Sequence, residues 1–268
     1  MSDPIEIRSS SWGDLADCAL RWQAIHVYDF RTPATVPAHM GTAVHFGSAV
    51  YDTGRMDKND VSIADAVEAA VDAFEHPEED IRWRNDDYSK KDALTITIKA
   101  TEAYCKELSP GNDYSAVELR PEPLDISVEG QTIRISGKMD RTRIVKEKQG
   151  VGIRDIKTGR ARVSAAGQVN TNGDKFQIGV YEVLTEHSLN QPVTAAGEIA
   201  AVNTTKHVRT GVGKVYAAKE LMLGSETEPG MIETAAKMVK HGLFPPNPRS
   251  RLCSERWCPI YHLCKAHD

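Results

Sequence analysis

Residues 137–160, with the sequence GKMDRTRIVKEKQGVGIRDIKTGR, constrain the fold of this chain more than any other stretch. Residues 133–145 alternate and are rich in β-branched side chains, which predicts a strand. Residues 146–150 are charged and end in glycine, as a hairpin turn does. Residues 152–157 then predict the returning strand. We therefore expect an antiparallel β-hairpin at the centre of the fold.

The predicted hairpin gathers charged side chains at one place. Residues two apart on a strand point to the same side, so Asp155 and Lys157 share a face, and the hairpin brings Asp140 beside them. Carboxylates at a common site repel each other unless a cation lies between them. Hard divalent cations such as Mg²⁺ and Mn²⁺ bind through oxygen ligands of this kind. The pattern predicts a metal site whose lysine steadies an anionic substrate or the attacking water; the alternative is a surface hairpin with ordinary charges.

Length and composition limit the class of protein. The chain has 268 residues, of which 40% are hydrophobic, enough for the core of one large domain. The N-terminal residues lack the apolar segment of a signal peptide, and no apolar run is long enough to cross a membrane. We therefore expect a soluble, cytoplasmic protein. The net charge of −5 argues against a sequence-independent nucleic-acid coat, but it permits a nuclease.

Hydrophobic periodicity predicts both helices and strands along the chain. Helices are expected over residues 14–28, 39–52, 61–74, 89–108, 174–188 and 229–243. Strands are expected over residues 115–120, 124–128, 133–145, 152–157, 193–202 and 206–215. With both kinds of element present, the expected fold is α/β.

The cysteines predict a metal-bound cluster. The chain has five, and an odd number argues against a disulfide framework. Four form a three-plus-one layout: Cys253, Cys258 and Cys264 near the C-terminus, and Cys18 near the N-terminus. Four thiolates can hold a structural zinc ion or an iron–sulfur cluster. His262 or His267 could replace Cys18, which would favour zinc, and the alternative is unlinked reduced thiols. The fifth, Cys105, is expected to be a buried small hydrophobe.

A group of basic residues follows the predicted helix 174–188. Lys206, Arg209 and Lys214 lie close together in the sequence of an otherwise acidic protein. Such clustering predicts contact with an anionic nucleic-acid backbone. The alternative is an ordinary solvated surface.

Several motifs occur in a fixed order along nearly the whole chain. They are Cys18, the G-x-x-x-H motif from Gly41 to His45, Asp140, the Asp155-Ile156-Lys157 strand, the Q-x-x-x-Y motif from Gln177 to Tyr181, and the three C-terminal cysteines. In this order the chain resembles the PD-(D/E)XK nuclease superfamily in its iron–sulfur branch. That branch includes the Cas4 exonucleases, the AddB-like and RecB-like nuclease domains and their phage relatives.

The resemblance implies a restriction-endonuclease-like core, in which helices flank a central mixed β-sheet. Residues 1–268 would form a single nuclease domain whose N- and C-terminal segments are joined by a metal cluster. The implied cluster is [4Fe–4S], with zinc as the alternative. Two departures from the family pattern occur: Asp155 stands where Glu is frequent, and four residues, rather than two, separate Cys253 from Cys258.

The resemblance also implies a role for each residue of the catalytic motifs. A catalytic Mn²⁺ or Mg²⁺ would be held by Asp140 and Asp155, with His45 as a nitrogen ligand that suits Mn²⁺ better. The Ile156 carbonyl would complete the ligand set. Lys157 would orient the hydrolytic water or stabilise the charge of the transition state.

Further residues are implied to support these groups. Gln177 and Tyr181, four apart on one helical face, would position the lysine or the nucleic-acid strand. Glu118 is a further candidate, as an acid behind the metal ligands.

The expected function is that of a divalent-metal-dependent exonuclease that hydrolyses single-stranded or end-containing DNA in recombination, repair or phage DNA processing. The chain has no G-x-x-x-x-G-K-[ST] motif, so we expect it to act alone or with a helicase, recombinase or integrase, in a bacterial or phage-infected cell. The alternatives are a nuclease that trims DNA for CRISPR adaptation and a catalytically inactive, metal-stabilised DNA-binding module.

Overall fold

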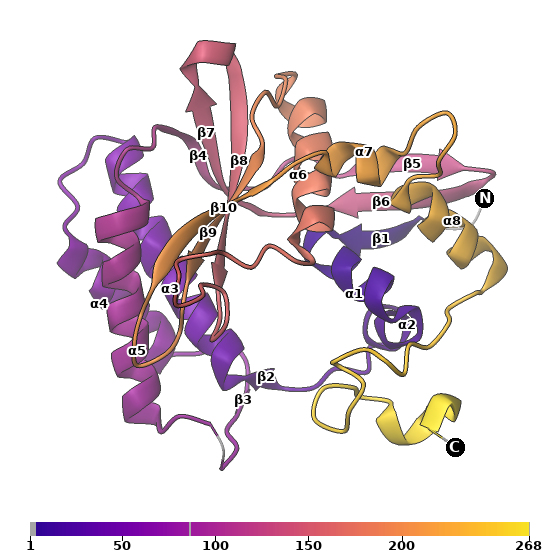
Figure 1. Ribbon diagram of the computed structural model, residues 1–268, viewed down its shortest axis with the longest axis horizontal. Coiled ribbons are helices and arrows are strands. Elements are labelled where there is room, and N and C mark those ends of the chain that lie inside the picture. The colour runs from indigo at the N-terminus through magenta and orange to yellow at the C-terminus, as the bar shows by residue number, and fades with distance from the viewer. Residues whose placement is uncertain (1–3, 86, 268) are drawn as a thin grey trace.

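A five-stranded mixed β-sheet with the strand order β10-β9-β8-β7-β4 forms the centre of the molecule (Figure 1). The computed structural model describes residues 4–85 and 87–267. Strands β8 and β9 run parallel, and the other neighbours are antiparallel. The strands are β4 (Tyr114–Leu119), β7 (Met139–Val145), β8 (Gly150–Thr158), β9 (Gly197–Val202) and β10 (Thr210–Val215).

A second, three-stranded sheet lies beside the first and has the order β1-β6-β5. Its strands are β1 (Ile5–Arg8), β5 (Leu124–Val128) and β6 (Gln131–Ser136). Two short strands, β2 (Ala34–Thr35) and β3 (Ile81–Arg82), pair in parallel elsewhere. The α/β prediction is confirmed, but the strands divide into separate sheets instead of forming one.

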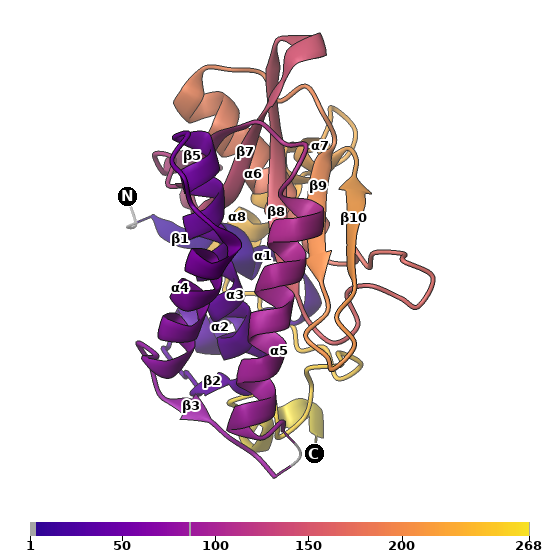
Figure 2. The same cartoon turned by 90° about the vertical axis from the view of Figure 1, so that its left-hand side faces the viewer.

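Helices pack on both faces of the five-stranded sheet (Figures 1 and 2). On one face lie α3 (Val36–Met56), α4 (Ile63–Glu75) and α5 (Lys90–Ala103), which continues as a π-helix over Tyr104–Leu108. On the other side lie α6 (Asp174–Leu189) and α7 (Ala218–Leu223), whereas α8 (Met231–His241) packs on β5 and β6 of the three-stranded sheet. Alternate residues of β8 serve the two cores, since Ile156 packs with Val44 of α3 and Ile153 packs in the core that contains Ile178 of α6. None of the described helices is both long and apolar enough to cross a bilayer.

The predicted hairpin is confirmed as β7 and β8. The strands pair from Val145 opposite Gly150 to Arg141 opposite Arg154. The chain turns through a short 3-10 helix, and Gln149 adopts a left-handed conformation with φ 48°. This places Asp140 and Asp155 on adjacent strands, as the hairpin prediction required.

The prediction of one strand over residues 133–145 is wrong. The segment divides into β6 and β7, which belong to different sheets. The division falls at Gly137, where an added Cβ would lie 2.6 Å from the Ser9 hydroxyl oxygen and 3.0 Å from a ring carbon of Tyr181. Glycine is needed here because two other segments press against the backbone where the chain leaves one sheet for the other.

The predicted helix over residues 14–28 is interrupted. It forms α1 (Trp12–Asp17) and α2 (Ala19–His26), separated by Cys18 in an extended conformation. The break turns the second helix away from the first and leaves Cys18 at the junction. The sequence analysis did not predict β1 or α7.

The C-terminal tail lies beside α1 and α2, in the N-terminal part of the chain (Figure 1). The side-chain amide of Asn247 donates to the Asp17 carbonyl at 2.8 Å, and the Leu20 amide donates to the Pro245 carbonyl at 3.3 Å. The Ser250 hydroxyl also donates to the Asp17 carboxylate. Hydrogen bonds therefore connect the chain ends that the sequence analysis expected to be joined.

Candidate active site

The candidate site lies where β7 and β8 separate. Their ladder ends at the pair Arg141–Arg154, and beyond it the Ile156 amide donates to Asp140 Oδ2 at 2.7 Å. A side-chain carboxylate thus takes the place of a backbone carbonyl from the neighbouring strand. The bond fixes the orientation of a buried carboxylate, since Asp140 is only 7% exposed.

A chain of hydrogen bonds connects β8 to α6. The Lys157 ammonium lies 2.6 Å from Asp155 Oδ2 and donates to Gln177 Oε1 at 2.8 Å. The Gln177 amide nitrogen donates to Asp155 Oδ1 at 3.3 Å and to the Tyr181 hydroxyl at 2.7 Å. That hydroxyl donates to the Lys138 carbonyl at 2.7 Å. The residues of the D-x-K and Q-x-x-x-Y motifs therefore form one network.

Helix α3 supplies His45 to the same place. Its Nδ1 lies 3.3 Å from Asp140 Oδ1. One turn earlier, an added Cβ at Gly41 would lie 2.6 Å from the Thr158 hydroxyl oxygen. The glycine of the G-x-x-x-H motif thus allows α3 to approach the end of β8 closely enough for His45 to reach Asp140.

Burial and mutual charge shift the ionisation of the two carboxylates in opposite directions. Burial raises the pKa of Asp155 to about 6, and the Asp140 charge adds to this although Lys157 opposes it. Burial also acts to raise the pKa of Asp140, but His45 and Lys157 outweigh it and hold that pKa below its usual range. Two carboxylates with opposed shifts are typical of a functional site.

The nearby carboxylates raise the pKa values of both His45 and Lys157. Burial acts to lower the pKa of His45, but the charge and hydrogen bond of Asp140, together with the charge of Asp155, outweigh this effect and raise the pKa. Burial likewise opposes the charge on Lys157, whose pKa is nevertheless raised by Asp155 and then Asp140. The site therefore stabilises positive charge beside its carboxylates.

The donor types at this site suit a hard divalent cation. Two carboxylates and one imidazole supply oxygen and nitrogen ligands of the kind that Mn²⁺ and Mg²⁺ accept. Among residues 4–85 and 87–267, however, no three or more His, Cys, Asp or Glu side chains are already arranged around a metal position. Lys157 and His45 instead lie on the carboxylates of Asp155 and Asp140.

Comparison with known proteins identifies the family. The family model of the PD-(D/E)XK nuclease superfamily matches residues 10–265. The chain belongs to this superfamily. Membership implies a hydrolase that acts on nucleic acids, and PD-(D/E)XK nucleases generally use divalent metals such as Mg²⁺ or Mn²⁺. No curated protein matches the chain.

Two solved structures are similar to the chain at low sequence identity. One is a protein from Eubacterium rectale that is named provisionally as an exonuclease, with 15% identity and a TM-score of 0.52 over 91% of this chain and 84% of that one. Another is named SSO0001, with 12% identity and a TM-score of 0.46 over 99% of this chain and 88% of that one. At this identity the likeness to the Eubacterium protein concerns the fold alone.

The four cysteines of the predicted cluster lie at the joined chain ends of this PD-(D/E)XK nuclease. Cys18 is buried, and its sulfur accepts a hydrogen bond from the Asn247 amide at 3.4 Å. Burial, followed by the charges of Cys258, Cys18 and Cys264, raises the pKa of the Cys253 thiol. The thiols are therefore close enough to affect one another, and binding a cation would reverse that mutual repulsion. In the described part of the chain they are not arranged as a metal site.

The basic residues lie on or next to β10, two strands from Asp155 in the sheet. Lys206, Arg209 and Lys214 are exposed on and before β10, the edge strand two places from β8 in the sheet. Lys206 lies 3.8 Å from Asp92. Their role as DNA contacts stays a prediction.

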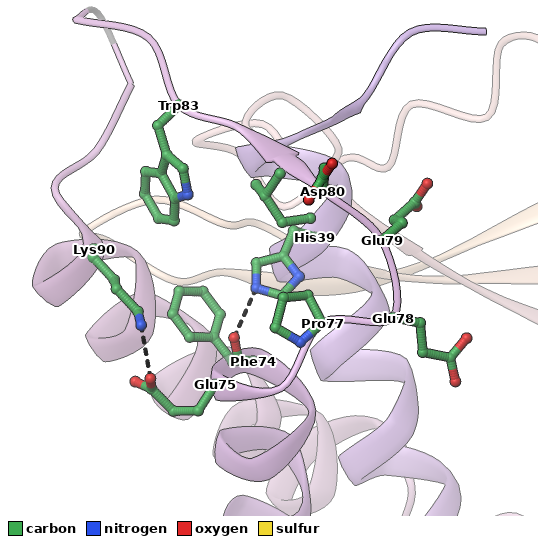
Figure 3. A pocket seen from close by; sticks show the side chains of 10 residues that line it. His39, Phe74, Glu75, Pro77, Glu78, Glu79, Asp80, Trp83 and Lys90 are labelled. Atoms are coloured by element: carbon green, nitrogen blue, oxygen red, sulfur yellow. Dashed lines mark hydrogen bonds and ion pairs between the residues drawn. The ribbon is translucent and has the colours of Figure 1, made fainter.

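A surface pocket of about 580 Å³ lies beside the end of α4, lined also by a residue of α3 and by the first residue of α5 (Figure 3). His39, Phe74 and Trp83 line it together with several carboxylates, and no residue of the catalytic motifs does. His39 is bonded to the Phe74 carbonyl at 2.9 Å, so it has a structural role there. The pocket is therefore separate from the candidate active site.

The sequence analysis missed a buried polar network beside the motifs. Arg141 and Asp52 are completely buried and bonded to each other at 2.7 Å. Arg141 also lies 3.3 Å from Glu118, which in turn pairs with Lys138. The available signals were the arginine next to Asp140 and an aspartate seven residues after His45 on the same helix.

Proposed function

We propose that the chain is a metal-dependent nuclease that hydrolyses phosphodiester bonds of single-stranded or end-containing DNA, acting as an exonuclease. The observation that carries the proposal is the convergence of His45, Asp140, Asp155 and Lys157 from α3, β7 and β8 on one partly buried point. Phosphodiesters resist attack because their backbone is anionic and water is a poor nucleophile. A site that offers ligands for a cation and a partly buried ammonium meets both difficulties.

In this proposal the carboxylates of Asp140 and Asp155 hold the cation, with His45 and the Ile156 carbonyl as further ligands. When bound, the divalent ion would neutralise phosphate charge and lower the pKa of its water. Burial raises the pKa of Asp155 to about 6. The bound cation would act in the opposite direction, because it favours the ionised carboxylate.

Lys157 is assigned to the reacting phosphate or the attacking water. Its ammonium is held by Asp155 at 2.6 Å and by Gln177 at 2.8 Å, so its position is set before substrate binds. Tyr181 orients Gln177 through the 2.7 Å hydrogen bond between them. Gln177 and Tyr181 thus act by placing the lysine.

The proposal covers the whole chain as one nuclease domain, residues 1–268, and places its substrate path along Lys206, Arg209 and Lys214. It gives the protein a role in recombination, repair or phage DNA processing, together with a helicase or recombinase partner. Assignment to the Cas4-like, AddB-like or RecB-like iron–sulfur branch also belongs to the proposal.

The iron–sulfur assignment rests on the donor set at the chain ends. A [4Fe–4S] cluster would be bound by Cys18, Cys253, Cys258 and Cys264, and zinc is the alternative metal for the same thiolates. Such a cluster would add to the hydrogen bonds that Asn247 and Ser250 make to Asp17. It would constrain the unfolded chain by closing a long loop.

The test compares wild-type protein with Asp140→Asn on oligonucleotides labelled at either end. Asparagine keeps an oxygen that can accept the hydrogen bond from the Ile156 amide, so the fold should be retained. The negative charge that would hold the cation is lost. We expect the wild type to release nucleotides progressively from an end with Mn²⁺ or Mg²⁺ and to stop in EDTA. Asp140→Asn should bind the same DNA without cutting it. Equal cleavage by both proteins, or cleavage in EDTA, would overturn the proposal, and a wild type that binds DNA without cutting would indicate a DNA-binding module.

A further inference from the structure

We propose that Arg141 is a positioning residue that holds His45 and Asp140 in register with each other. The proposal rests on the function proposed above, because that function makes this pair the ligands of one cation. Arg141 is completely buried and follows Asp140 on β7. It touches neither the substrate nor the cation in this scheme, and it acts through the backbone of the two ligand residues.

The guanidinium bonds directly to the Asp140 carbonyl and is linked to the His45 carbonyl through the Ser48 hydroxyl. Its Nη1 donates to the Asp140 carbonyl at 2.6 Å, and its Nη2 donates to the Ser48 hydroxyl oxygen at 3.1 Å. The Ser48 hydroxyl donates in turn to the His45 carbonyl at 2.8 Å. One planar group therefore connects the strand that carries Asp140 to the helix turn that carries His45.

A buried carboxylate anchors the guanidinium. Arg141 Nε donates to Asp52 Oδ2 at 2.7 Å, and Tyr104 donates to the same oxygen at 2.6 Å. The Ser109 hydroxyl donates to the other oxygen of Asp52. Tyr104 and Ser109 lie on and directly after the π-helix that ends α5, so this segment and β7 both donate to one carboxylate of α3. Asp52 is completely buried, and these bonds satisfy both of its oxygens.

The spacing of three residues on α3 explains how one arginine fixes the position of the helix. His45, Ser48 and Asp52 stand at positions i, i+3 and i+7 and form a stripe along one helical face. Arg141 bonds to two members of this stripe, while the third is the proposed metal ligand. Rotation or sliding of α3 along β7 would break both bonds, so they fix the position of His45 relative to Asp140.

Directional bonding is the advantage of this arrangement over apolar packing. Replacing a buried ion pair by hydrophobic side chains is often neutral or favourable for stability, so stability alone does not explain the pair. The guanidinium, however, has a rigid fork of donors that specifies geometry. A metal site needs its ligands held to within about 0.5 Å, which is the demand such a fork can meet. Lysine, a flexible point charge with a single nitrogen, could not bridge these partners at once.

The test uses Ser48→Ala, which cuts the connection from Arg141 to His45 and keeps the buried ion pair. Its matched control is Thr97→Val, which deletes another completely buried hydroxyl, one that donates to its own helix at 2.9 Å and makes no bond to Arg141. Both proteins are titrated with Mn²⁺ and the free ion is measured by electron paramagnetic resonance. Thermal unfolding and DNA affinity in EDTA are measured alongside.

We expect Ser48→Ala to raise the Mn²⁺ dissociation constant about 10-fold, the lower range for the loss of a group that orients metal ligands. Thr97→Val should lower the unfolding temperature by a similar amount and leave the Mn²⁺ affinity unchanged. DNA affinity in EDTA should be the same in both. Arg141→Lys should weaken Mn²⁺ binding at least as much as Ser48→Ala, and if it fails to fold, Ser48→Ala decides.

Two results would overturn the inference in distinguishable ways. Wild-type Mn²⁺ affinity in Ser48→Ala, in a protein whose Asp140→Asn variant loses Mn²⁺ binding, would reject the positioning role alone. A wild-type protein that binds no Mn²⁺ would reject the proposed function and this inference together. An equal loss of Mn²⁺ affinity in Thr97→Val would also reject it, since the effect would then be one of general stability.

Discussion

The Lys157 ammonium lies 2.6 Å from Asp155 Oδ2, and the same nitrogen is 2.8 Å from Gln177 Oε1. The carboxylate stabilises the protonated form of the lysine, and the amide sets the direction in which the ammonium points. Because the ammonium has three donors, a proton remains for a phosphate oxygen or a water molecule. This geometry is the basis of the first prediction.

Replacing Lys157 with Met should abolish most cleavage while DNA binding persists. The substitution keeps the length of the side chain and removes the charge proposed to stabilise the transition state. We expect kcat to fall by about 10²–10³, as for the loss of one preorganised donor at a reacting oxyanion. Single-turnover cleavage in Mn²⁺ and binding in EDTA measure the two effects. Lys99→Met, at an exposed position of α5, is the control and should cut normally; wild-type cleavage by Lys157→Met would exclude the lysine.

The hairpin that carries this site was predictable because its signals are local. Alternation, β-branched side chains and a charged turn ending in glycine all lie within residues 133–157, and each acts over a few residues. The pairing of β7 with β8 confirmed them. The point at which residues 133–145 change sheets was not predictable, because it depends on the packing of Ser9 and Tyr181 against Gly137.

The groups around the motifs escaped prediction for the same physical reason. Arg141 and Asp52 are 89 residues apart, and nothing in either local sequence indicates that they form an ion pair. Because arginine is rarely buried, a position occupied by arginine is expected to be exposed. Sequence motifs therefore identified the groups proposed for chemistry, whereas the groups that hold them in place required the tertiary structure.

The second prediction concerns the thiols at the chain ends. Cys18→Ser should abolish metal incorporation, because it removes the one ligand contributed by the N-terminal segment. Anaerobically purified wild type should be coloured and contain iron, and the variant should be colourless with a lower unfolding temperature. Metal analysis and visible absorption measure this. Cys105→Ala is the control, since Cys105 is buried in a separate core and should leave metal content unchanged. Stoichiometric zinc without iron would reject the iron–sulfur cluster.

The third prediction concerns the exposed basic residues before and on β10. Replacing Lys206, Arg209 and Lys214 together by Ala should weaken DNA binding and reduce its dependence on salt. Each lost phosphate contact on a single strand removes roughly 0.7 from the slope of log affinity against log salt, so the slope should fall by about 2. Fluorescence anisotropy over a range of salt concentrations measures both quantities.

A control separates local contact from net charge. It removes three lysines from other surfaces, and its positions are Lys58, Lys99 and Lys240. This variant changes net charge by the same amount and should keep a steeper salt dependence than the β10 variant. If the two triple variants behave alike, the β10 residues do not form a specific path for DNA.

The fourth prediction concerns the pH dependence of stability. Burial, with help from Glu220, raises the pKa of Glu182 to about 7, although the Lys219 amide donates to its carboxylate at 2.8 Å. A carboxylate with a raised pKa binds its proton more tightly in the folded state. The free energy of unfolding therefore decreases as pH rises from about 4.5 to about 7 and stays lower above that range.

Glu182→Gln should remove this pH dependence, because the amide is neutral and still accepts the Lys219 hydrogen bond. We expect the variant to be more stable than wild type by about 1–2 kcal/mol at pH 8 and equal to it at pH 4. Urea unfolding followed by circular dichroism at both pH values measures the difference. Glu226→Gln, on an exposed loop, is the control. A constant difference between Glu182→Gln and wild type at both pH values would contradict the assignment.

The fifth prediction concerns the glycine that lets α3 approach β8. In Gly41→Ala the new Cβ would lie 2.6 Å from the Thr158 hydroxyl oxygen, so the helix must move or the threonine must rotate. We expect a loss of about 1–3 kcal/mol in stability from overpacking, with weaker Mn²⁺ binding because His45 moves away from Asp140.

Thr158→Ala alone removes the obstructing group and should retain activity. The double variant Gly41→Ala with Thr158→Ala should then recover the Mn²⁺ affinity lost in Gly41→Ala, which an unrelated helix defect could not do. If the double variant binds Mn²⁺ no better than Gly41→Ala, contact with Thr158 is not the reason that this position is glycine.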